Sequence, residues 1–140
     1  MAEIPDVRPE KYGFRDERIS RRHRLYGVAC TMVDLDFLVI EYHLKKVVAL
    51  VEYKHHRGES SLNLEDSNYQ ALMDMADRAD LPFFISFYHP ETWNYIVYPG
   101  NMSSYKWIKT KTEMNEYDYV RFLYKIRYIN IKQDILDKLL

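Results

Sequence analysis

The spacing of apolar residues along the chain predicts a mixed succession of helices and strands. Apolar side chains recur at helical spacing in four segments, residues 14–26, 66–79, 113–127 and 131–139. Short runs rich in β-branched and aromatic residues predict strands over residues 32–42, 47–54, 83–89 and 93–99. The order α-β-β-α-β-β-α-α indicates an α/β (α+β) fold, in which helices flank a mixed central sheet and the last helices form a C-terminal extension.

The second predicted strand changes from apolar to charged residues near its end. The run from Val47 to Val51 is apolar at every position, which is typical of a central strand buried on both faces. Glu52 and Lys54 follow, and they share one face because side chains alternate along a strand. A buried charge costs several kcal/mol unless it is paired or bound to a metal. The pair therefore indicates either a strand end that emerges into solvent or contact with a third group.

Two aspartates near the start of the preceding strand are candidates for that third group. Residues 32–42 and 47–54 are predicted to pair as an antiparallel hairpin, in which the start of one strand lies beside the end of the next. Asp36 would then neighbour Glu52, and Asp34, which has the same parity, competes for this position. Converging carboxylates repel each other unless a divalent cation lies between them, such as Mg²⁺ or, in its place, Mn²⁺.

A metal held by Asp36 and Glu52, with Asp34 as the competing ligand, indicates a particular reaction. The metal would lower the pKa of a bound water and screen the charge of a scissile phosphate. Lys54 would position or activate that water and stabilise the developing negative charge. The pattern predicts a divalent-metal-dependent nuclease that hydrolyses phosphodiester bonds without a covalent enzyme intermediate.

A carboxylate, a hairpin and then Glu-x-Lys at the end of an apolar strand resemble the core of the PD-(D/E)xK nuclease superfamily. This superfamily has a restriction-endonuclease-like fold and includes restriction enzymes, archaeal Holliday-junction resolvases and phage or repair exonucleases. The matching residues are Asp36, Glu52 and Lys54, and the resemblance spans residues 14–98. Leu35 stands where the superfamily has a proline. The resemblance implies Mg²⁺-dependent endonuclease activity on DNA, whether duplex, branched or single-stranded.

The resemblance also implies two further site residues and one more strand. Superfamily members often carry a glutamine on the helix that follows the lysine strand, and Gln70 stands at that place. Many members have a glutamate on the first helix that faces the metal, and Glu17 is its counterpart here. The superfamily core, α-β-β-β-α-β, has three strands before its second helix, which predicts a short additional strand near residues 28–31.

Basic residues are concentrated near the N-terminus, although the net charge of the whole chain is only −1. The segment from Arg8 to Arg24 carries seven basic and three acidic residues. Such a segment either meets the phosphates of a nucleic acid or forms the solvated face of a helix. The candidate nucleic-acid-binding residues are Arg18, Arg21, Arg22, His23 and Arg24 on the first helix and His55 directly after Lys54.

Length and composition narrow the class of protein further. A chain of 140 residues fits one domain, with a nuclease-like core over residues 14–98 and C-terminal helices over residues 113–140. Cys30 is the only cysteine, which excludes an internal disulfide and a cysteine-based zinc site. No apolar run approaches a bilayer span and the N-terminal segment has no signal core, so a soluble, cytoplasmic protein is expected. The apolar last helix is predicted either to cover the sheet or to form a homodimer interface.

Two other functions stay open from the residues alone. A catalytically inactive nuclease-fold protein would act as a nucleic-acid-binding or assembly module, and such a protein has no physical need for three charges at one point. An unrelated α+β protein-interaction domain would keep Asp36 and Glu52 apart. The distance between these two carboxylates therefore separates the third hypothesis from the first two.

Overall fold

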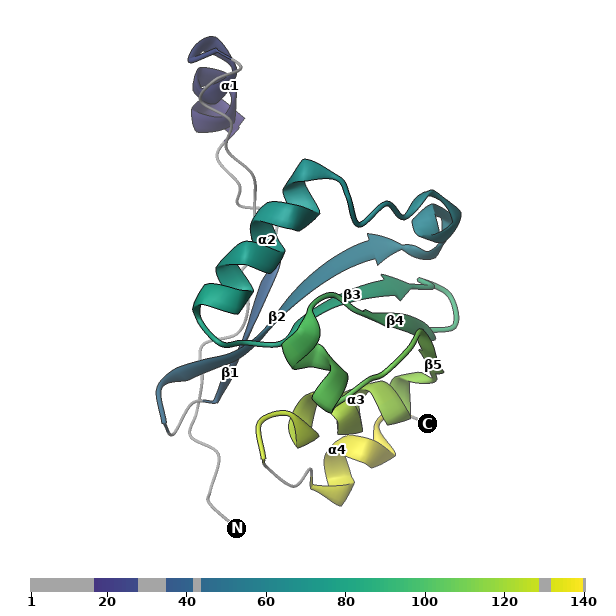
Figure 1. The fold of residues 1–140 in the computed structure, drawn as a ribbon. Coiled ribbons are helices and arrows are strands. Elements are labelled where there is room, and N and C mark those ends of the chain that lie inside the picture. Colours follow the sequence, from purple (N-terminus) through teal and green to yellow (C-terminus); the bar gives the residue numbers. More distant parts are fainter. Residues whose placement is uncertain (1–16, 28–34, 42–43, 129–131, 140) are drawn as a thin grey trace.

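A computed structural model describes residues 17–27, 35–41, 44–128 and 132–139 of the chain. Within them a five-stranded sheet has the spatial order β1-β2-β3-β4-β5, which follows the order of the strands in the chain (Figure 1). The strands are β1 (Phe37–Glu41), β2 (Lys46–His55), β3 (Phe83–Tyr88), β4 (Tyr95–Pro99) and β5 (Thr112–Met114). The fold is a mixed α/β architecture, as the apolar pattern predicts.

Helices precede the sheet, connect its strands and follow it. They are α1 (Glu17–Leu25), α2 (Ser67–Arg78), α3 (Glu116–Lys125) and α4 (Gln133–Asp137), with two 3₁₀ helices, η1 (His56–Ser61) and η2 (Met102–Lys106). In Figure 1, α1 lies apart from the sheet, whereas α2 covers one face and α3 and α4 lie together on the other side. Across the described part of the chain, no helix is both long and apolar enough to cross a membrane.

The direction of neighbouring strands decides which chain segments meet at each edge. β1 and β2 form the predicted antiparallel hairpin, whereas β2 and β3 are parallel. The pairs β3–β4 and β4–β5 are antiparallel. A parallel pair needs a crossover connection, and α2 lies in the connection between β2 and β3. Because these two strands are parallel, they end at the same edge of the sheet, where His55 is paired with Tyr88.

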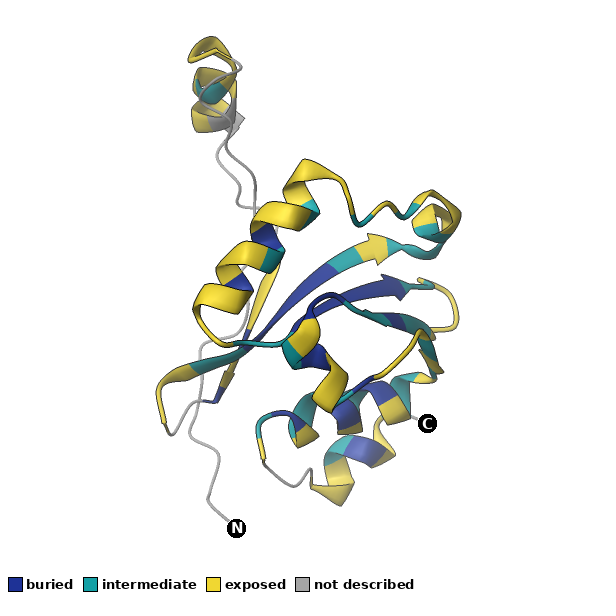
Figure 2. Ribbon diagram, in the orientation of Figure 1, coloured by how far each residue is buried: buried dark blue, intermediate teal, exposed yellow. Residues whose placement is uncertain are grey.

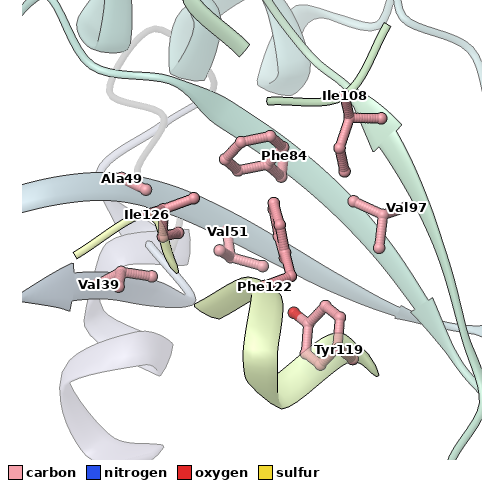
Figure 3. Packing of buried hydrophobic residues seen from close by; sticks show 9 residues of the cluster. All are labelled: Val39, Ala49, Val51, Phe84, Val97, Ile108, Tyr119, Phe122 and Ile126. Carbon is pink, nitrogen blue, oxygen red and sulfur yellow. The ribbon is translucent and has the colours of Figure 1, made fainter. Parts of the chain in front are cut away.

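Hydrophobic clusters cover both faces of the sheet. On one face Leu50 of β2 packs in a cluster with Leu72 of α2. On the other face Val51 of β2 packs in a cluster with Phe122 of α3 (Figure 3). Buried residues are concentrated along β2 and β3 in Figure 2. The prediction that the apolar run of β2 is a central strand buried on both faces is therefore confirmed.

The observed elements differ from the predicted ones where short local structures begin or end. The helix predicted over residues 113–127 begins only at Glu116, because residues 112–114 pair with β4 as an additional strand. Asn115 caps this helix by accepting a hydrogen bond from the backbone N–H of Asp118. The additional strand predicted near residues 28–31 lies outside the described residues.

Candidate active site

The start of β1 and the end of β2 bring two carboxylates together. Phe37 is paired with Val51, so one further step along the antiparallel register sets Asp36 opposite Glu52. Asp36 Oδ2 accepts a hydrogen bond of 3.0 Å from the backbone N–H of Tyr53. The hairpin therefore holds Asp36 against the end of β2 on the side of Glu52.

The Glu52 carboxyl group is buried beside another acid. Glu52 exposes only 8% of its surface. Burial, followed by the negative charge of Asp36, raises the pKa of Glu52 above its ordinary value. Lys54 acts in the opposite direction, and a hydrogen bond between the two carboxyl groups adds to the increase. A carboxyl pair of this kind favours either a shared proton or a bound cation.

Lys54 lies at the exposed margin of the carboxylate pair. Its Nζ is 3.3 Å from Glu52 Oε1, and 48% of its side chain is exposed. Partial burial lowers the pKa of Lys54, but the hydrogen bond and charge of Glu52 outweigh this and leave the pKa above its ordinary value. The ammonium group is therefore charged at neutral pH, and its other N–H donors are available to a ligand.

Helix α2 adds a hydroxyl group that the sequence pattern did not single out as functional. Tyr69 lies in the first turn of α2, close enough to Lys54 and Glu52 for their charges to act on its hydroxyl. Burial is the main reason that the pKa of Tyr69 is raised, and Lys54 opposes it. In the sequence Tyr69 is part of an apolar helical stripe, which indicates packing. Only the crossing of α2 over β2 shows that its polar end borders the site.

Gln70, which the family resemblance implies as a site residue, makes a different contact. Its side-chain amide donates a hydrogen bond of 2.7 Å to the backbone oxygen of Leu64, in the loop before α2. Consecutive helical residues point about 100° apart around the axis, so Gln70 cannot follow the direction of Tyr69. The described contacts of Gln70 therefore hold the start of α2 and do not join it to the carboxylates.

The basic helix α1 is not brought to the carboxylate pair. Glu17 begins α1, which lies apart from the sheet in Figure 1. The candidate nucleic-acid-binding residues on this helix are exposed or partly exposed: Arg18, Arg21, Arg22, His23 and Arg24. Asp34, the competing metal ligand, lies outside the described residues. Within the described part of the chain, the site is thus made by Asp36, Glu52 and Lys54.

The chemistry of this donor set fits a hard divalent cation. Mg²⁺ usually takes one or two carboxylates and completes its coordination with water and substrate phosphate oxygens. Asp36 and Glu52 supply two such carboxylates on neighbouring strands. The described residues contain no group of three or more acidic, histidine or cysteine side chains placed for a metal. The pair therefore suits an ion bound largely by water and substrate, and not one enclosed by protein ligands.

The opposite face of β2 carries a network of neutral hydroxyl groups. The hydroxyl oxygens of Tyr53 and Tyr119 are 2.6 Å apart, and Tyr119 also lies 3.1 Å from Ser86 Oγ. The Tyr95 ring stacks on Tyr119 with centroids 3.8 Å apart. Burial raises the pKa of Tyr119 far above its ordinary value and that of Tyr95 to about 12. The network anchors the ring of Tyr53, whose backbone N–H holds Asp36 on the other side.

His55 belongs to an aromatic surface beyond Lys54. Its ring lies 4.5 Å from the ring of His56 and 5.6 Å from that of Tyr88, between centroids. Its Nδ1 accepts a hydrogen bond of 3.2 Å from the backbone N–H of Arg57. The structure therefore places this predicted nucleic-acid-binding residue at the end of β2, next to other exposed or half-buried rings.

Comparisons with known proteins identify no relative of this chain. No protein-family model, curated protein or solved structure matches it.

Proposed function

We propose that this protein is a divalent-metal-dependent nuclease that hydrolyses DNA phosphodiester bonds, with Asp36, Glu52 and Lys54 at its reactive centre. The observation that carries this proposal is the convergence of two carboxylates and an ammonium group at the end of a buried strand. Burying the Glu52 carboxylate beside the exposed carboxylate of Asp36 costs free energy, which a bound cation offsets. Such an arrangement is expected at a reactive centre and is unfavourable for stability alone.

The order of elements around the site supports a restriction-endonuclease-like core. β1, β2, α2 and β3 follow one another as the last four elements of the α-β-β-β-α-β order of the PD-(D/E)xK superfamily. Asp36 precedes the first of these strands, and Glu52 and Lys54 end the second, as the family pattern requires. The proposal therefore combines a local chemical pattern with the succession of elements that carries it.

Two carboxylates would hold the metal, and neighbouring groups orient one of them and shield the other from water. Asp36 and Glu52 are the ligands for Mg²⁺ or Mn²⁺. When bound, the ion would lower the pKa of a coordinated water. It would also place positive charge beside the scissile phosphate. The backbone N–H of Tyr53 orients Asp36 through its Oδ2. Burial keeps bulk water from Glu52, which strengthens the electrostatic interactions of its carboxylate.

Lys54 is the protein side chain that would contact the substrate directly. Its ammonium group donates to Glu52 Oε1 and keeps further N–H donors on its exposed side. These donors would orient an attacking water or contact a phosphate oxygen on which negative charge develops. Because the pKa of Lys54 is raised, the group acts as a charged donor and not as a general base at neutral pH.

The test is cleavage of linear duplex, branched and single-stranded DNA in Mg²⁺ or Mn²⁺. Lys54→Ala is expected to lower the cleavage rate by at least about a hundredfold, because it removes the charge that stabilises the transition state. Lys106→Ala removes an exposed lysine of η2 and is the matched control, which should cleave at the wild-type rate. Circular dichroism verifies that both variants fold. A wild-type protein that cleaves no member of the panel would contradict the proposal.

The alternative is an inactive nuclease-fold protein that serves as a nucleic-acid-binding or assembly module. Calorimetric titration with Mg²⁺ distinguishes the two functions, because the reactive centre must bind the ion and the inactive module need not. Binding to the wild type that is lost in Glu52→Gln supports the nuclease. Absence of Mg²⁺ binding to the wild type supports the alternative.

A further inference from the structure

Five aromatic side chains form a continuous surface at the edge of the sheet beyond Lys54. They are His55, His56, Tyr88, His89 and Trp93, and together they are called the aromatic platform. We propose that the aromatic platform binds unpaired nucleobases of single-stranded DNA by stacking. As a subsite for the strand being cut, this inference rests on the proposed nuclease function; as a binding surface it is independent of it.

The rings of the aromatic platform contact one another in an unbroken chain. His56 and His89 stack with centroids 4.1 Å apart and planes 17° apart. Tyr88 and Trp93 lie nearly parallel, 6.2 Å apart and at 18°. His55 joins the two pairs, at 4.5 Å from His56 and 5.6 Å from Tyr88. The chain of contacts gives a surface of ring faces and edges instead of isolated aromatic residues.

The platform is held in place before any ligand arrives. Parallel pairing of β2 and β3 places His55 beside Tyr88. In the following turn the Trp93 N–H donates to His89 O at 2.8 Å, and His89 Nδ1 accepts from the backbone N–H of Glu91 at 3.2 Å. Rings that are already ordered lose little conformational entropy on binding, which favours stacking.

The aromatic platform is not part of the hydrophobic core. Neither cluster of described core residues includes any of its five members. Trp93 is 43% exposed, and the other four rings are half-buried. An exposed tryptophan stacked beside half-buried rings leaves ring faces open to a planar ligand. Base–aromatic stacking uses such faces and tolerates any base, because every base has a π face.

The open ring faces of the platform, and not its charges, favour a single strand over a duplex. Lys54 precedes the platform and Arg57 follows its first two members, whereas Glu91 lies within the turn. This balance gives little attraction for the phosphates of either form of DNA, and the paired bases of a duplex also hide their faces. Burial, and next the neighbouring His89 and His55, lower the pKa of His56, so its stacked ring is neutral at neutral pH. Binding must then come mainly from the rings, and single-stranded DNA supplies the faces they need.

The position of the platform relates it to the reactive centre. Lys54 and His55 are consecutive in β2, and His56 lies four residues beyond Glu52, about 13 Å along an extended chain. His55 and Lys54 point to opposite faces of β2, so a DNA strand whose phosphate contacts Lys54 would pass around the end of β2 and place bases a few nucleotides away over the aromatic platform. The platform would hold the strand on one side of the scissile bond.

The test is binding of an oligothymidylate dodecamer in EDTA, where no metal-dependent cleavage occurs. The chain has two tryptophans, so Trp107→Phe leaves Trp93 as the single indole reporter. Saturable quenching of Trp93 fluorescence by the oligonucleotide is expected, whereas an abasic strand of equal length and charge should quench little. Equal quenching by the abasic strand, or none by either, would overturn the proposal.

Two variants and a control locate the binding surface. Trp93→Ala and His56→Ala should each weaken oligothymidylate binding about tenfold, measured by fluorescence anisotropy of a labelled strand. Tyr105→Ala removes a ring of similar exposure, 47%, from η2 and should leave the affinity unchanged. η2 lies at the opposite end of β3 from the platform: its capping residue, Asn101, accepts a hydrogen bond from the backbone N–H of Phe83, where β3 begins. Unchanged affinity in both platform variants, or tighter binding of a matched duplex, would contradict the proposal.

The result also separates this inference from the proposed nuclease function. Oligothymidylate binding at Trp93 by a protein that cleaves no DNA supports the aromatic platform and contradicts the nuclease. Metal-dependent cleavage by a protein whose Trp93 is not quenched supports the nuclease and overturns the platform.

Discussion

Strand β2 presents two different kinds of polar group on its two faces. Tyr53 faces α3, where its hydroxyl and those of Tyr119 and Ser86 satisfy one another without charge. Glu52 and Lys54 face α2, where Asp36 adds a second carboxylate. Neutral hydroxyls both donate and accept, so they can form a closed network, but two carboxylates cannot. The difference indicates that the hydroxyl face stabilises the fold, whereas the carboxylate face retains a demand for a proton or a cation.

The largest expected effect is on the hydroxyl face. Tyr119→Ala removes an almost fully buried ring and should lower the free energy of unfolding by about 3–5 kcal/mol. Tyr119→Phe keeps the ring and removes only the hydroxyl, so a loss of about 1–2 kcal/mol is expected because Tyr53 and Ser86 lose their partner. Urea denaturation measures both. Equal losses in the two variants would show that the hydroxyl network, and not ring packing, accounts for the whole effect.

The next effect separates activity from stability on the carboxylate face. Glu52→Gln keeps the shape of the side chain but removes one of two repelling charges. DNA cleavage should fall by at least about a hundredfold, while the free energy of unfolding stays equal or rises by about 1 kcal/mol. Ser86→Ala, on the hydroxyl face, is the control and should behave in the opposite way, with lower stability and unchanged cleavage. A destabilised Glu52→Gln protein would indicate that Glu52 serves the fold.

The raised pKa of Glu52 gives a pH dependence of known sign. The folded protein holds a proton on Glu52 at pH values where the unfolded chain, with an ordinary value of 4.5, has lost it. The contribution of Glu52 to the free energy of unfolding therefore falls as the pH rises from 4.5 through the raised pKa. Across that window the free energy of unfolding of Glu52→Gln should increase relative to the wild type. Urea midpoints at a series of pH values measure this difference, and a constant difference would argue against the shift.

The smallest expected effect comes from an ion pair that is fully solvated. Arg78 Nε lies 2.9 Å from Asp74 Oδ2 on the outer side of α2, and both side chains are exposed. Exposed pairs of this spacing contribute at most about 0.5 kcal/mol, and salt screens them. Arg78→Ala should therefore lower the free energy of unfolding, measured by urea denaturation, by at most about 0.5 kcal/mol. The rate of DNA cleavage should not change. A larger loss would mean that α2 depends on the pair for its position.

The succession of the main elements follows from local patterns, and most of it could be predicted. The apolar run of β2 and the polar turn before it predict the hairpin, and the helical stripe around Leu72 predicts α2. β5 could not be predicted, because three residues without alternation form a strand only where β4 offers an edge. The two 3₁₀ helices are likewise short, and their side-chain caps form only in the folded chain.

The site likewise contains residues that the sequence predicted and residues that only the structure revealed. Glu52 and Lys54 could be predicted because they follow one another in a single strand, whereas the aspartate could be narrowed only to Asp34 or Asp36. Gln70 was expected at the site from the family resemblance, and its described side-chain hydrogen bond is to Leu64, whereas Tyr69, which gave no functional signal in the sequence, lies close enough to Lys54 and Glu52 for their charges to act on it. Trp93 gave no signal in the sequence beyond its aromatic side chain. The aromatic platform exists only because two strands distant in the chain end at one edge.

The sequence by itself determined that Glu52 and Lys54 share a face, since side chains on a strand alternate with a period of two. It also limited the neighbouring acid to Asp34 or Asp36, but the register of the hairpin shifts between Val39 and Ile40, and this shift sets Asp36 opposite Glu52. Only the tertiary structure decided what surrounds this centre. The parallel pairing of β2 with β3 and the crossing of α2 join residues far apart in the chain. Those contacts depend on packing against the whole sheet, which no local pattern encodes.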